Sequence, residues 1–316
     1  MSNMQTAGIH HITAFVRNAQ ETVDFYAGIL GLRLVKKTVN FDAPEVYHLY
    51  FGNESGAPGT VITFFPWPIS RQGRIGGGQV GITTYAVPVG SLAFWSSRLT
   101  QYGTRFERTE RFGETYLGFK DPDGLLIELV ERAQGAPSQW TFGGVPADKA
   151  IKGFGGAVLY STAPDATSQL LQRVMGLTRV GQEGAYERFQ SYGDIGNIID
   201  LNVTAMEQGA GGAGTVHHIA WRAKDDAEHA LWRSQVEECG YHPTAILDRQ
   251  YFHAIYFREE GGILFEIATD PPGFARDEAP DALGESIMLP SWFEANRAEI
   301  ERRLPPIRAR EIEPNR

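Results

Sequence analysis

Two pairs of adjacent histidines are the residues of this sequence best suited to chemistry. The pairs are His10-His11 and His217-His218, and each lies in a short apolar run typical of a strand. A single histidine in a strand usually serves packing, but two pairs at the same place in repeated sequence favour a metal site. Two imidazoles and one carboxylate form the facial ligand set that binds Fe(II) and leaves positions open for a substrate and dioxygen.

Strand geometry limits how each histidine pair can act. Successive side chains of a regular strand face opposite sides, so one member of each pair can point into a shared cavity. The other member then serves behind or beside it. His48 and His253 lie outside this pattern, and we assign them no role from the sequence.

The carboxylate of such a site should come from another repeated feature. Four apolar runs each carry an acid, or a residue in its place, four positions after a glycine: Thr63, Glu128, Asp200 and Glu266. Combining the first and fourth runs with the histidines gives His11, His218 and Glu266, and Thr63 would be a poor fourth ligand. Other combinations give His11 with Glu128, or His218 with Asp200 and Glu266. Only the first combination uses both histidine pairs, so we favour it as a hypothesis chosen by chemistry.

These residues belong to a unit that occurs four times. Each unit predicts a strand, a helix that ends at a glycine and a short antiparallel sheet. Odd units match odd units and even units match even units, which indicates duplication of a two-unit block. The predicted organisation is an N-terminal half, a linker, a C-terminal half and a tail with one helix. The half at 1–135 holds units 8–66 and 79–132, the linker is 136–152, the half at 153–270 holds units 153–203 and 214–270, and the tail is 271–316.

The tail carries its own helix signal. Ser291-Trp292-Phe293-Glu294 has the pattern of a capping box, and Pro305-Pro306 would stop a helix at about Leu304. We expect this tail to pack across the body of the protein or against a partner subunit. Its apolar stretch at 288–293 is compatible with a homo-oligomer.

Composition excludes several classes of protein. The 316 residues include 38 acids and 29 bases, and the net charge of −9 repels nucleic acid and anionic membrane surfaces. The single cysteine rules out an intramolecular disulfide and a four-cysteine zinc site. No apolar run approaches the roughly 18 residues of a membrane helix, and the first residues lack the pattern of a secretion signal. We therefore expect a cytoplasmic protein with no nucleic-acid or membrane partner.

The sequence resembles the vicinal oxygen chelate superfamily, and more narrowly its hydroquinone ring-cleaving dioxygenases. The resemblance runs from Gly8 to the tail beyond Leu289-Pro290. Its most specific pieces are Gly8-Ile9-His10-His11-Ile12-Thr13, Val216-His217-His218-Ile219, and Asp248-Arg249 through Tyr256-Phe257-Arg258 to Glu266. The resemblance implies an α+β fold of four βαβββ modules in two tandem halves, forming cup-shaped mixed sheets.

The resemblance also implies the roles of individual residues. Its iron ligands fall on His11, His218 and Glu266, held by the first and fourth units. Its further catalytic residues fall on a surrounding set: His10, Thr13, His217, Arg249 and Tyr256. The sequence fits these roles, because Thr13 lies two residues after His11 on the same strand face and Tyr256 lies roughly opposite Glu266 in a predicted hairpin.

The implied activity is a ring-cleaving dioxygenase that uses Fe(II), with Mn(II) as the alternative metal. Its substrates would be O2 and a para-hydroquinone, including chlorinated or methylated forms, and its product a 4-hydroxymuconic semialdehyde type. Catechols remain an alternative substrate, although extradiol enzymes take both histidines from their C-terminal half. A redox-neutral glyoxalase-type lyase or isomerase is a second alternative, but it generally needs a carboxylate where this chain has Thr63. A metal-free binding protein is the third alternative, and it would leave the paired histidines unexplained.

Overall fold

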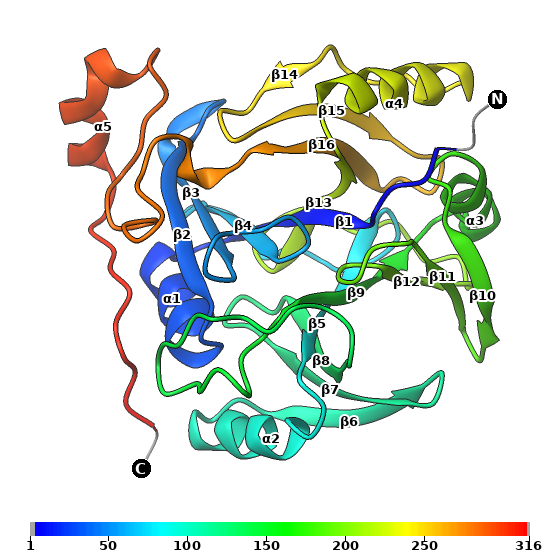
Figure 1. The fold of residues 1–316 in the computed structure, drawn as a ribbon, viewed down its shortest axis with the longest axis horizontal. Helices are drawn as coiled ribbons and strands as arrows, with labels where there is room; N and C mark the ends of the chain where they lie inside the picture. The colour runs from blue at the N-terminus through cyan, green and yellow to red at the C-terminus, as the bar shows by residue number, and fades with distance from the viewer. Residues whose placement is uncertain (1–3, 315–316) are drawn as a thin grey trace.

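The computed structural model describes residues 4–314 and contains two eight-stranded mixed sheets (Figure 1). The first sheet has the strand order β14-β15-β16-β13-β1-β4-β3-β2. Its strands are β1 (Ile9–Val16), β2 (Arg33–Asn40), β3 (Ala43–Gly52), β4 (Val61–Pro66), β13 (Thr215–Ala223), β14 (Leu247–Asp248), β15 (Phe252–Arg258) and β16 (Leu264–Pro272). This sheet joins the first and fourth units of the repeat.

The second sheet joins the two middle units. Its strand order is β10-β11-β12-β9-β5-β8-β7-β6. Its strands are β5 (Gln79–Val87), β6 (Phe106–Arg111), β7 (Glu114–Lys120), β8 (Leu126–Glu131), β9 (Gly153–Tyr160), β10 (Thr178–Glu183), β11 (Tyr186–Gln190) and β12 (Ile198–Asn202). Each sheet therefore draws strands from both halves of the chain.

Helices connect the first two strands of each unit. They are α1 (Ala19–Val23) with the π-helical turn η1 (Asp24–Ile29), α2 (Leu92–Gln101), α3 (Pro164–Arg173) and α4 (Asp226–Glu238). The four modules confirm the predicted α+β class of tandem vicinal oxygen chelate units. The boundaries of the halves and of the linker stay predictions.

The repeated glycine has a conformational cause. Gly59, Gly124, Gly196 and Gly262 have φ angles of 88°, 99°, 63° and 91°, which glycine adopts without the steric cost of a Cβ. Each of these glycines ends the turn before the last strand of its unit. The spacing from glycine to the acid position is therefore fixed by the entry into that strand.

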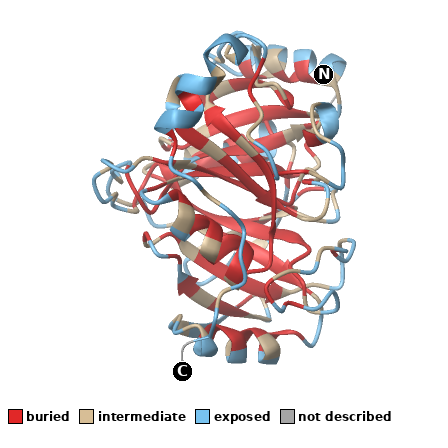
Figure 2. Ribbon diagram, turned by 90° about the vertical axis from the view of Figure 1, so that its left-hand side faces the viewer, coloured by how far each residue is buried: buried red, intermediate tan, exposed pale blue. Residues whose placement is uncertain are grey.

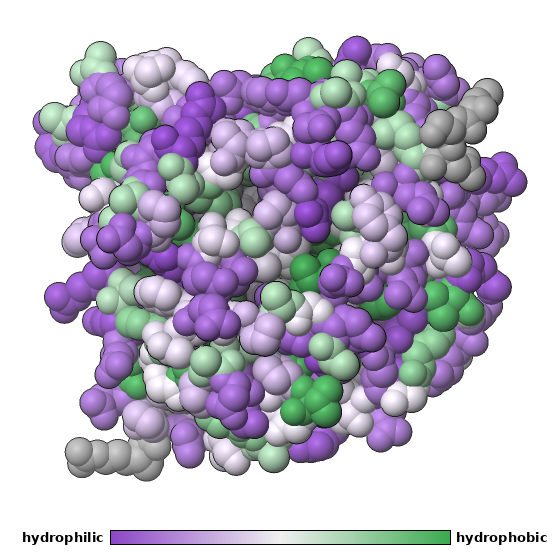
Figure 3. Space-filling view, in the orientation of Figure 1, coloured by the Kyte–Doolittle hydropathy of each residue, from purple (hydrophilic) through white to green (hydrophobic). Residues whose placement is uncertain are grey.

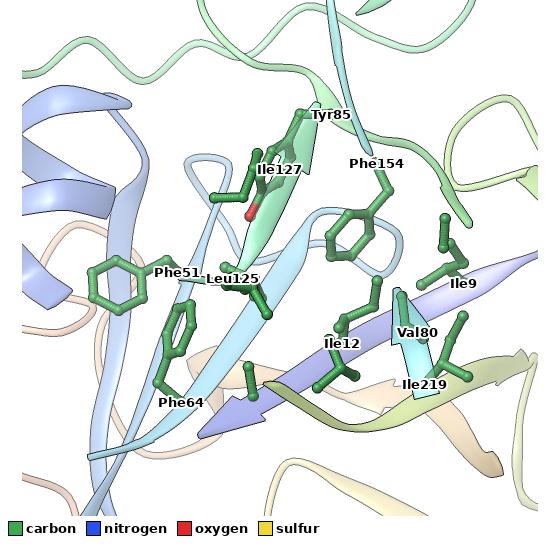
Figure 4. Packing of buried hydrophobic residues seen from close by; sticks show 14 of the residues in the cluster. Ile9, Ile12, Phe51, Phe64, Val80, Tyr85, Leu125, Ile127, Phe154 and Ile219 are labelled. Carbon is green, nitrogen blue, oxygen red and sulfur yellow. The ribbon is translucent and has the colours of Figure 1, made fainter. Parts of the chain in front are cut away.

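The core lies where the two sheets meet. Ile12 of β1 and Ile219 of β13 pack in one cluster with Val80 of β5 and Phe154 of β9 (Figure 4). Buried residues run through the inner strands of both sheets, while exposed residues lie mainly on helices, loops and the edge strands β6 and β10 (Figure 2). The face drawn in Figure 3 is mainly hydrophilic, with separate small apolar spots. Side chains that alternate with Ile12 along β1 are therefore free to build a site on the other face of the first sheet.

The tail lies along the edge of the first sheet, where Ile287 pairs with Lys37 of β2, and its helix begins later than the sequence predicts. The capping-box expectation at Ser291 is wrong, because the N–H groups of Phe293 and Asn296 bond carbonyls three residues back. These tight turns lead through η3 (Glu294–Asn296) into α5 (Arg297–Arg303), after an earlier turn η2 (Phe274–Arg276). The hydroxyl of Tyr47 in β3 donates to the carbonyl of Pro305 at 2.9 Å. The tail thus lies against the edge of the first sheet.

Two expectations concern the ends of the chain and membranes. The expectation about a secretion signal concerns the first residues of the chain, of which residues 1–3 lie outside the described residues. Within residues 4–314, none of the helices combines the length and the apolar composition that crossing a bilayer requires.

Candidate active site

The two histidine pairs meet because β1 and β13 are adjacent antiparallel strands. Thr13 of β1 lies opposite His218 of β13 in their register. The Nε2 atoms of His11 and His218 are 3.2 Å apart, and their ring centroids are separated by 5.4 Å. Strand β16 runs parallel to β13 and places Glu266 beside Ala220, so its carboxylate reaches the same point. Glu128 and Asp200, the acids of the alternative combinations, lie in the second sheet.

The three side chains have the geometry of a metal site. Oε2 of Glu266 lies 2.8 Å from Nε2 of His218 and 3.3 Å from Nε2 of His11. Ligand atoms about 2.1 Å from one ion at neighbouring octahedral positions are about 3.0 Å apart, so these separations suit a facial set. Glu266 is fully buried, and neither of its oxygens accepts a well-directed hydrogen bond from a described residue. Burying a carboxylate that accepts no directed hydrogen bond costs several kcal/mol of folding free energy, and a bound cation would offset this cost.

The charges of the three residues also suit a cation. Burial alone would raise the pKa of Glu266, but His11 and His218 hold that pKa well below its usual value. Burial lowers the pKa of His218, although the Glu266 carboxylate opposes this effect. An ionised carboxylate with a neutral imidazole is the protonation state in which these groups bind metals.

The second histidine of each pair contacts the ring of the first. Nδ1 of His10 lies 2.9 Å from Nδ1 of His11, and Nδ1 of His217 lies 2.8 Å from Nδ1 of His218. When Nε2 of His11 or His218 faces a cation, its Nδ1 carries the proton and donates to its neighbour. Each pair can therefore fix the orientation of its metal-facing ring.

Both pairs lie at bulges, which changes one expectation from the sequence. The register of β1 and β13 shifts between Ile9 and His11, which leaves His10 as an extra residue of β1. It shifts again between His218 and Val216, which leaves His217 as an extra residue of β13. A bulge adds a residue and redirects side chains. His217 consequently lines the same cavity as His218, so the expectation that one member of a pair faces it is wrong for this pair. His10 stays buried beside Phe252, away from the cavity lining.

A cavity of about 350 Å³ opens beside the three converging side chains, two of which, His11 and His218, line it. Its wall includes five apolar aromatic side chains: Phe15, Phe41, Phe65, Trp67 and Phe252. About 150 Å³ already accommodates benzene in a protein interior, so this volume suits one substituted aromatic ring. The site is therefore an apolar slot with a charged base.

Arg249 and Tyr256 form one polar wall of this cavity. Tyr256 lies opposite Glu266 in the β15–β16 register, as the hairpin predicts. Nε of Arg249 donates to the Tyr256 hydroxyl at 3.3 Å, and its Nη1 lies 3.4 Å from Oδ2 of Asp42. Burial and the Glu266 carboxylate raise the pKa of Tyr256 well above its usual value, against the effect of Arg249. The phenol therefore stays protonated and can donate a hydrogen bond.

Thr13 does not contact the converging side chains through a hydrogen bond. Its hydroxyl lies 2.8 Å from that of Thr63, and both residues are fully buried. Thr63 in turn lies 2.8 Å from Nε2 of His48. Thr13 thus belongs to a hydrogen-bonded chain behind the cavity wall, and its catalytic role stays a prediction.

His48 lies at the site, although no role could be assigned to it from the sequence. The structure places this residue in the cavity wall, with its Nδ1 2.8 Å from the hydroxyl of Tyr50, which also lines the cavity. Aligning the first unit with the fourth would have found Tyr50, because it lies opposite Thr63 as Tyr256 lies opposite Glu266. His253, also given no role, is at the surface, with Nδ1 2.6 Å from Asp226.

The second sheet has an ion-pair cluster at the equivalent place. Nε of Arg111 donates to Asp200 at 2.7 Å, while its Nη1 and Nη2 donate to Glu128 at 3.0 and 2.6 Å. Burial would lower the pKa of Arg111, but its hydrogen bonds to Glu128 and Asp200 raise that pKa above its usual value. A guanidinium therefore occupies the place where a metal would lie between two acids.

Comparison with known proteins gives consistent relationships. The model of the Glyoxalase/Bleomycin resistance protein/Dioxygenase superfamily matches residues 8–129. MhqO of Bacillus subtilis (strain 168), provisionally named as a ring-cleaving dioxygenase, is 58% identical over 309 residues, covering 98% of this chain and 99% of that protein. Chlorohydroquinone/hydroquinone 1,2-dioxygenase of Sphingobium indicum is 36% identical over 309 residues, covering 94% of this chain and 95% of that enzyme.

A solved structure is also similar over nearly the whole chain. The crystal structure of a provisionally named dioxygenase from Bacillus subtilis subsp. subtilis str. 168 superposes with a TM-score of 0.97. It is 58% identical in sequence, and the match covers 98% of this chain and 99% of that one.

Proposed function

Because the chain belongs to the glyoxalase/bleomycin resistance protein/dioxygenase superfamily and to its ring-cleaving dioxygenases, we propose that it cleaves the ring of a para-hydroquinone with O2. The metal is Fe(II), with Mn(II) as the alternative, and the product is of the 4-hydroxymuconic semialdehyde type. The observation that carries the proposal is the convergence of His11, His218 and Glu266 beside an aromatic cavity that His11 and His218 line.

The three converging residues would hold the metal. Bound Fe(II) would lower the pKa of a phenolic hydroxyl and supply the one-electron chemistry that dioxygen needs. Two neutral imidazoles and one carboxylate leave a divalent ion with excess positive charge, which favours an anionic phenolate as partner. The three protein ligands also leave open the positions that two substrates require.

The walls of the cavity position the aromatic substrate. Phe15, Phe65 and Phe252 offer apolar surfaces against which a benzene ring can pack, and they exclude water from the site. The Tyr256 phenol donates a hydrogen bond to a substrate oxygen, and His217 takes up or returns a proton there. Arg249 supplies a fixed positive charge that stabilises anionic forms of the ring-derived product.

Thr63 argues against a redox-neutral lyase. It occupies the place equivalent to Glu266, since Thr13 pairs with Thr63 as Ala220 pairs with Glu266. Its hydroxyl is already hydrogen-bonded with Thr13 and His48. The fourth protein ligand that a glyoxalase-type site generally has is therefore missing.

Oxygen uptake tests the proposed function. Protein loaded with Fe(II) under anaerobic conditions is mixed with methylhydroquinone or catechol in oxygenated buffer, and the bound iron is measured in parallel. We expect about one O2 consumed per methylhydroquinone, well above autoxidation, and slower uptake with catechol. The Glu266→Gln variant serves as the matched control for iron-independent oxidation. Absence of uptake from protein that holds stoichiometric iron would contradict the proposal.

A further inference from the structure

The wall of the cavity on β3 repeats the wall on β15. Tyr50 lies opposite Thr63 in the β3–β4 pairing, and Tyr256 lies opposite Glu266 in the β15–β16 pairing. The two tyrosines are therefore equivalent positions of the first and fourth units, and both line the cavity. Tyr256 packs beside the ring of His218, at 5.7 Å between centroids, and its hydroxyl is bonded by Arg249.

Tyr50 has a different partner from Tyr256. Its hydroxyl lies 2.8 Å from Nδ1 of His48, a residue whose equivalent on β15 is Ala254 by register. Nε2 of His48 lies 2.8 Å from the Thr63 hydroxyl, which lies 2.8 Å from that of Thr13. Four side chains thus form one continuous chain of hydrogen bonds, from the cavity to the fully buried Thr13.

This chain of side chains has one more exchangeable proton than its hydrogen bonds require. Three hydroxyls and one neutral imidazole carry four exchangeable protons, whereas the chain contains three hydrogen bonds. A hydroxyl can accept two hydrogen bonds, so the extra proton lies on Thr13, on Thr63 or on Tyr50, and each of these arrangements keeps all three bonds. Among residues 4–314, none of these three hydroxyls has a further hydrogen-bond acceptor, and of the three only Tyr50 lines the cavity.

The polarity of the chain can also reverse. If Tyr50 keeps the extra proton, it donates to an oxygen in the cavity, while Nδ1 of His48 donates to Tyr50. If Tyr50 donates to Nδ1 of His48, the Tyr50 oxygen accepts from a substrate hydroxyl. Nε2 of His48 then donates to Thr63 instead of accepting from it, and Thr63 can donate to Thr13. One device can therefore bind an aromatic oxygen in its protonated or deprotonated state.

We propose that Tyr50 binds the substrate oxygen para to the one that faces the metal, and that His48 is the positioning residue that orients Tyr50. The inference rests on the proposed function and names the group that recognises the second oxygen. The two oxygens of a catechol are adjacent and can reach the same metal, whereas a para oxygen lies across the ring and needs a polar partner of its own. Tyr256 and Arg249 then remain available to the oxygen at the metal side.

Anaerobic binding of two probes tests this inference without turnover. The dissociation constants of hydroquinone and phenol are measured on iron-loaded wild type, Tyr50→Phe and two His48 variants. Phenol lacks the para oxygen, so the ratio of the two constants isolates its contribution. We expect Tyr50→Phe to weaken hydroquinone binding about three- to tenfold and to leave phenol binding unchanged, as for the loss of one neutral hydrogen bond.

The two His48 variants separate its two hydrogen bonds. The amide of His48→Asn falls near Nδ1 and can still bond Tyr50, whereas that of His48→Gln falls near Nε2 and can bond only Thr63. We expect His48→Asn to keep most of the hydroquinone preference and His48→Gln to lose it as Tyr50→Phe does. Tyr47→Phe is the matched control, because this neighbour on β3 bonds the Pro305 carbonyl outside the cavity.

Each outcome decides between the inference and its alternatives. An unchanged affinity ratio in Tyr50→Phe overturns the inference while leaving the proposed function standing, if wild type consumes O2 with hydroquinone. Equal weakening of both probes shows a merely structural role and also overturns it. Iron-loaded wild type that binds neither probe overturns the proposed function together with the inference.

Discussion

Glu266 and Glu128 occupy equivalent positions of the two sheets but face opposite kinds of partner. Glu266 lies beside Ala220 in β16 and meets two histidines, whereas Glu128 lies beside Thr84 in β8 and meets the Arg111 guanidinium. Both carboxylates are buried. The second sheet therefore supplies a guanidinium to Glu128, whereas the first sheet leaves Glu266 without a permanently charged side chain.

This difference predicts that Arg111 stabilises the fold. Arg111→Met would leave Glu128 as a buried carboxylate without its cation, while Asp200 would keep its ion pair with Arg188. The substitution should lower the free energy of unfolding by about 3–5 kcal/mol. Urea denaturation followed by circular dichroism measures the change. Arg179→Met is the control, since its ion pair with Glu187 is partly exposed and should contribute less than about 1 kcal/mol. Similar losses in the two variants would show that the buried cluster is not specially important.

Removing a converging residue of the first sheet should abolish metal retention. His11→Ala and Glu266→Gln each delete one of three donors, and we expect affinity for Fe(II) to fall by more than about a hundredfold with the fold intact. Iron content after gel filtration and circular dichroism give the two readouts. His253→Ala, which changes a surface histidine, should retain iron. Iron-replete and fully active variants at both ligand positions would show that the ligand set is wrong.

The polar residues beside the converging side chains should affect rate more than metal content. Tyr256→Phe removes a hydroxyl and His217→Ala removes an imidazole, yet His11, His218 and Glu266 remain. We expect both variants to hold iron when it is supplied in excess, and turnover to fall about 10²–10⁴-fold if these groups move protons. Oxygen uptake measured against bound iron separates the two effects. Loss of iron in both variants would place these residues among the metal ligands instead.

Asp121 predicts a stability change with pH that is independent of the site. Burial raises its pKa from 3.8 to about 6, while the N–H of Leu125 and the hydroxyl of Tyr26 oppose the shift. Between these values the folded chain holds a proton that the unfolded chain has lost, so this residue's contribution to stability falls as pH rises from about 4 to 6 and stays low above. The total fall should be about 2–3 kcal/mol.

Asp121→Asn should remove this fall. Its amide oxygen can still accept from the N–H groups of Asp123 and Leu125. Its NH2 can donate to the Tyr26 oxygen, whereas in the wild type the Tyr26 hydroxyl donates to the carboxylate. Unfolding free energies of wild type and variant are compared at pH 4 and pH 7.5. The variant's advantage should grow with pH, and a difference that stays constant across the range would disprove the assignment.

Local features of the sequence were sufficient for the four repeated units and for the types of residue at the site. A glycine that must adopt positive φ marks the last strand of every unit, and short apolar runs mark the strands, because both depend on nearby residues only. The histidine pairs and Glu266 could be chosen as ligands because few combinations of residues give two imidazoles and one carboxylate. The start of α5 was predicted wrongly, since the turns after Pro290 bond three residues back.

The arrangement of units in space was decided by tertiary structure. The sequence shows four similar units, but the pairing of β1 with β13 joins residues about two hundred positions apart, and local propensity says nothing about such pairing. The bulges that turn His217 into the cavity arise from the register of those two strands. The position of His48 beside Tyr50 and Thr63, and of Arg111 between two acids, likewise depends on neighbouring strands. Hydrogen bonds between strands and burial of their shared face fix these contacts, and both exist only once the sheets have formed.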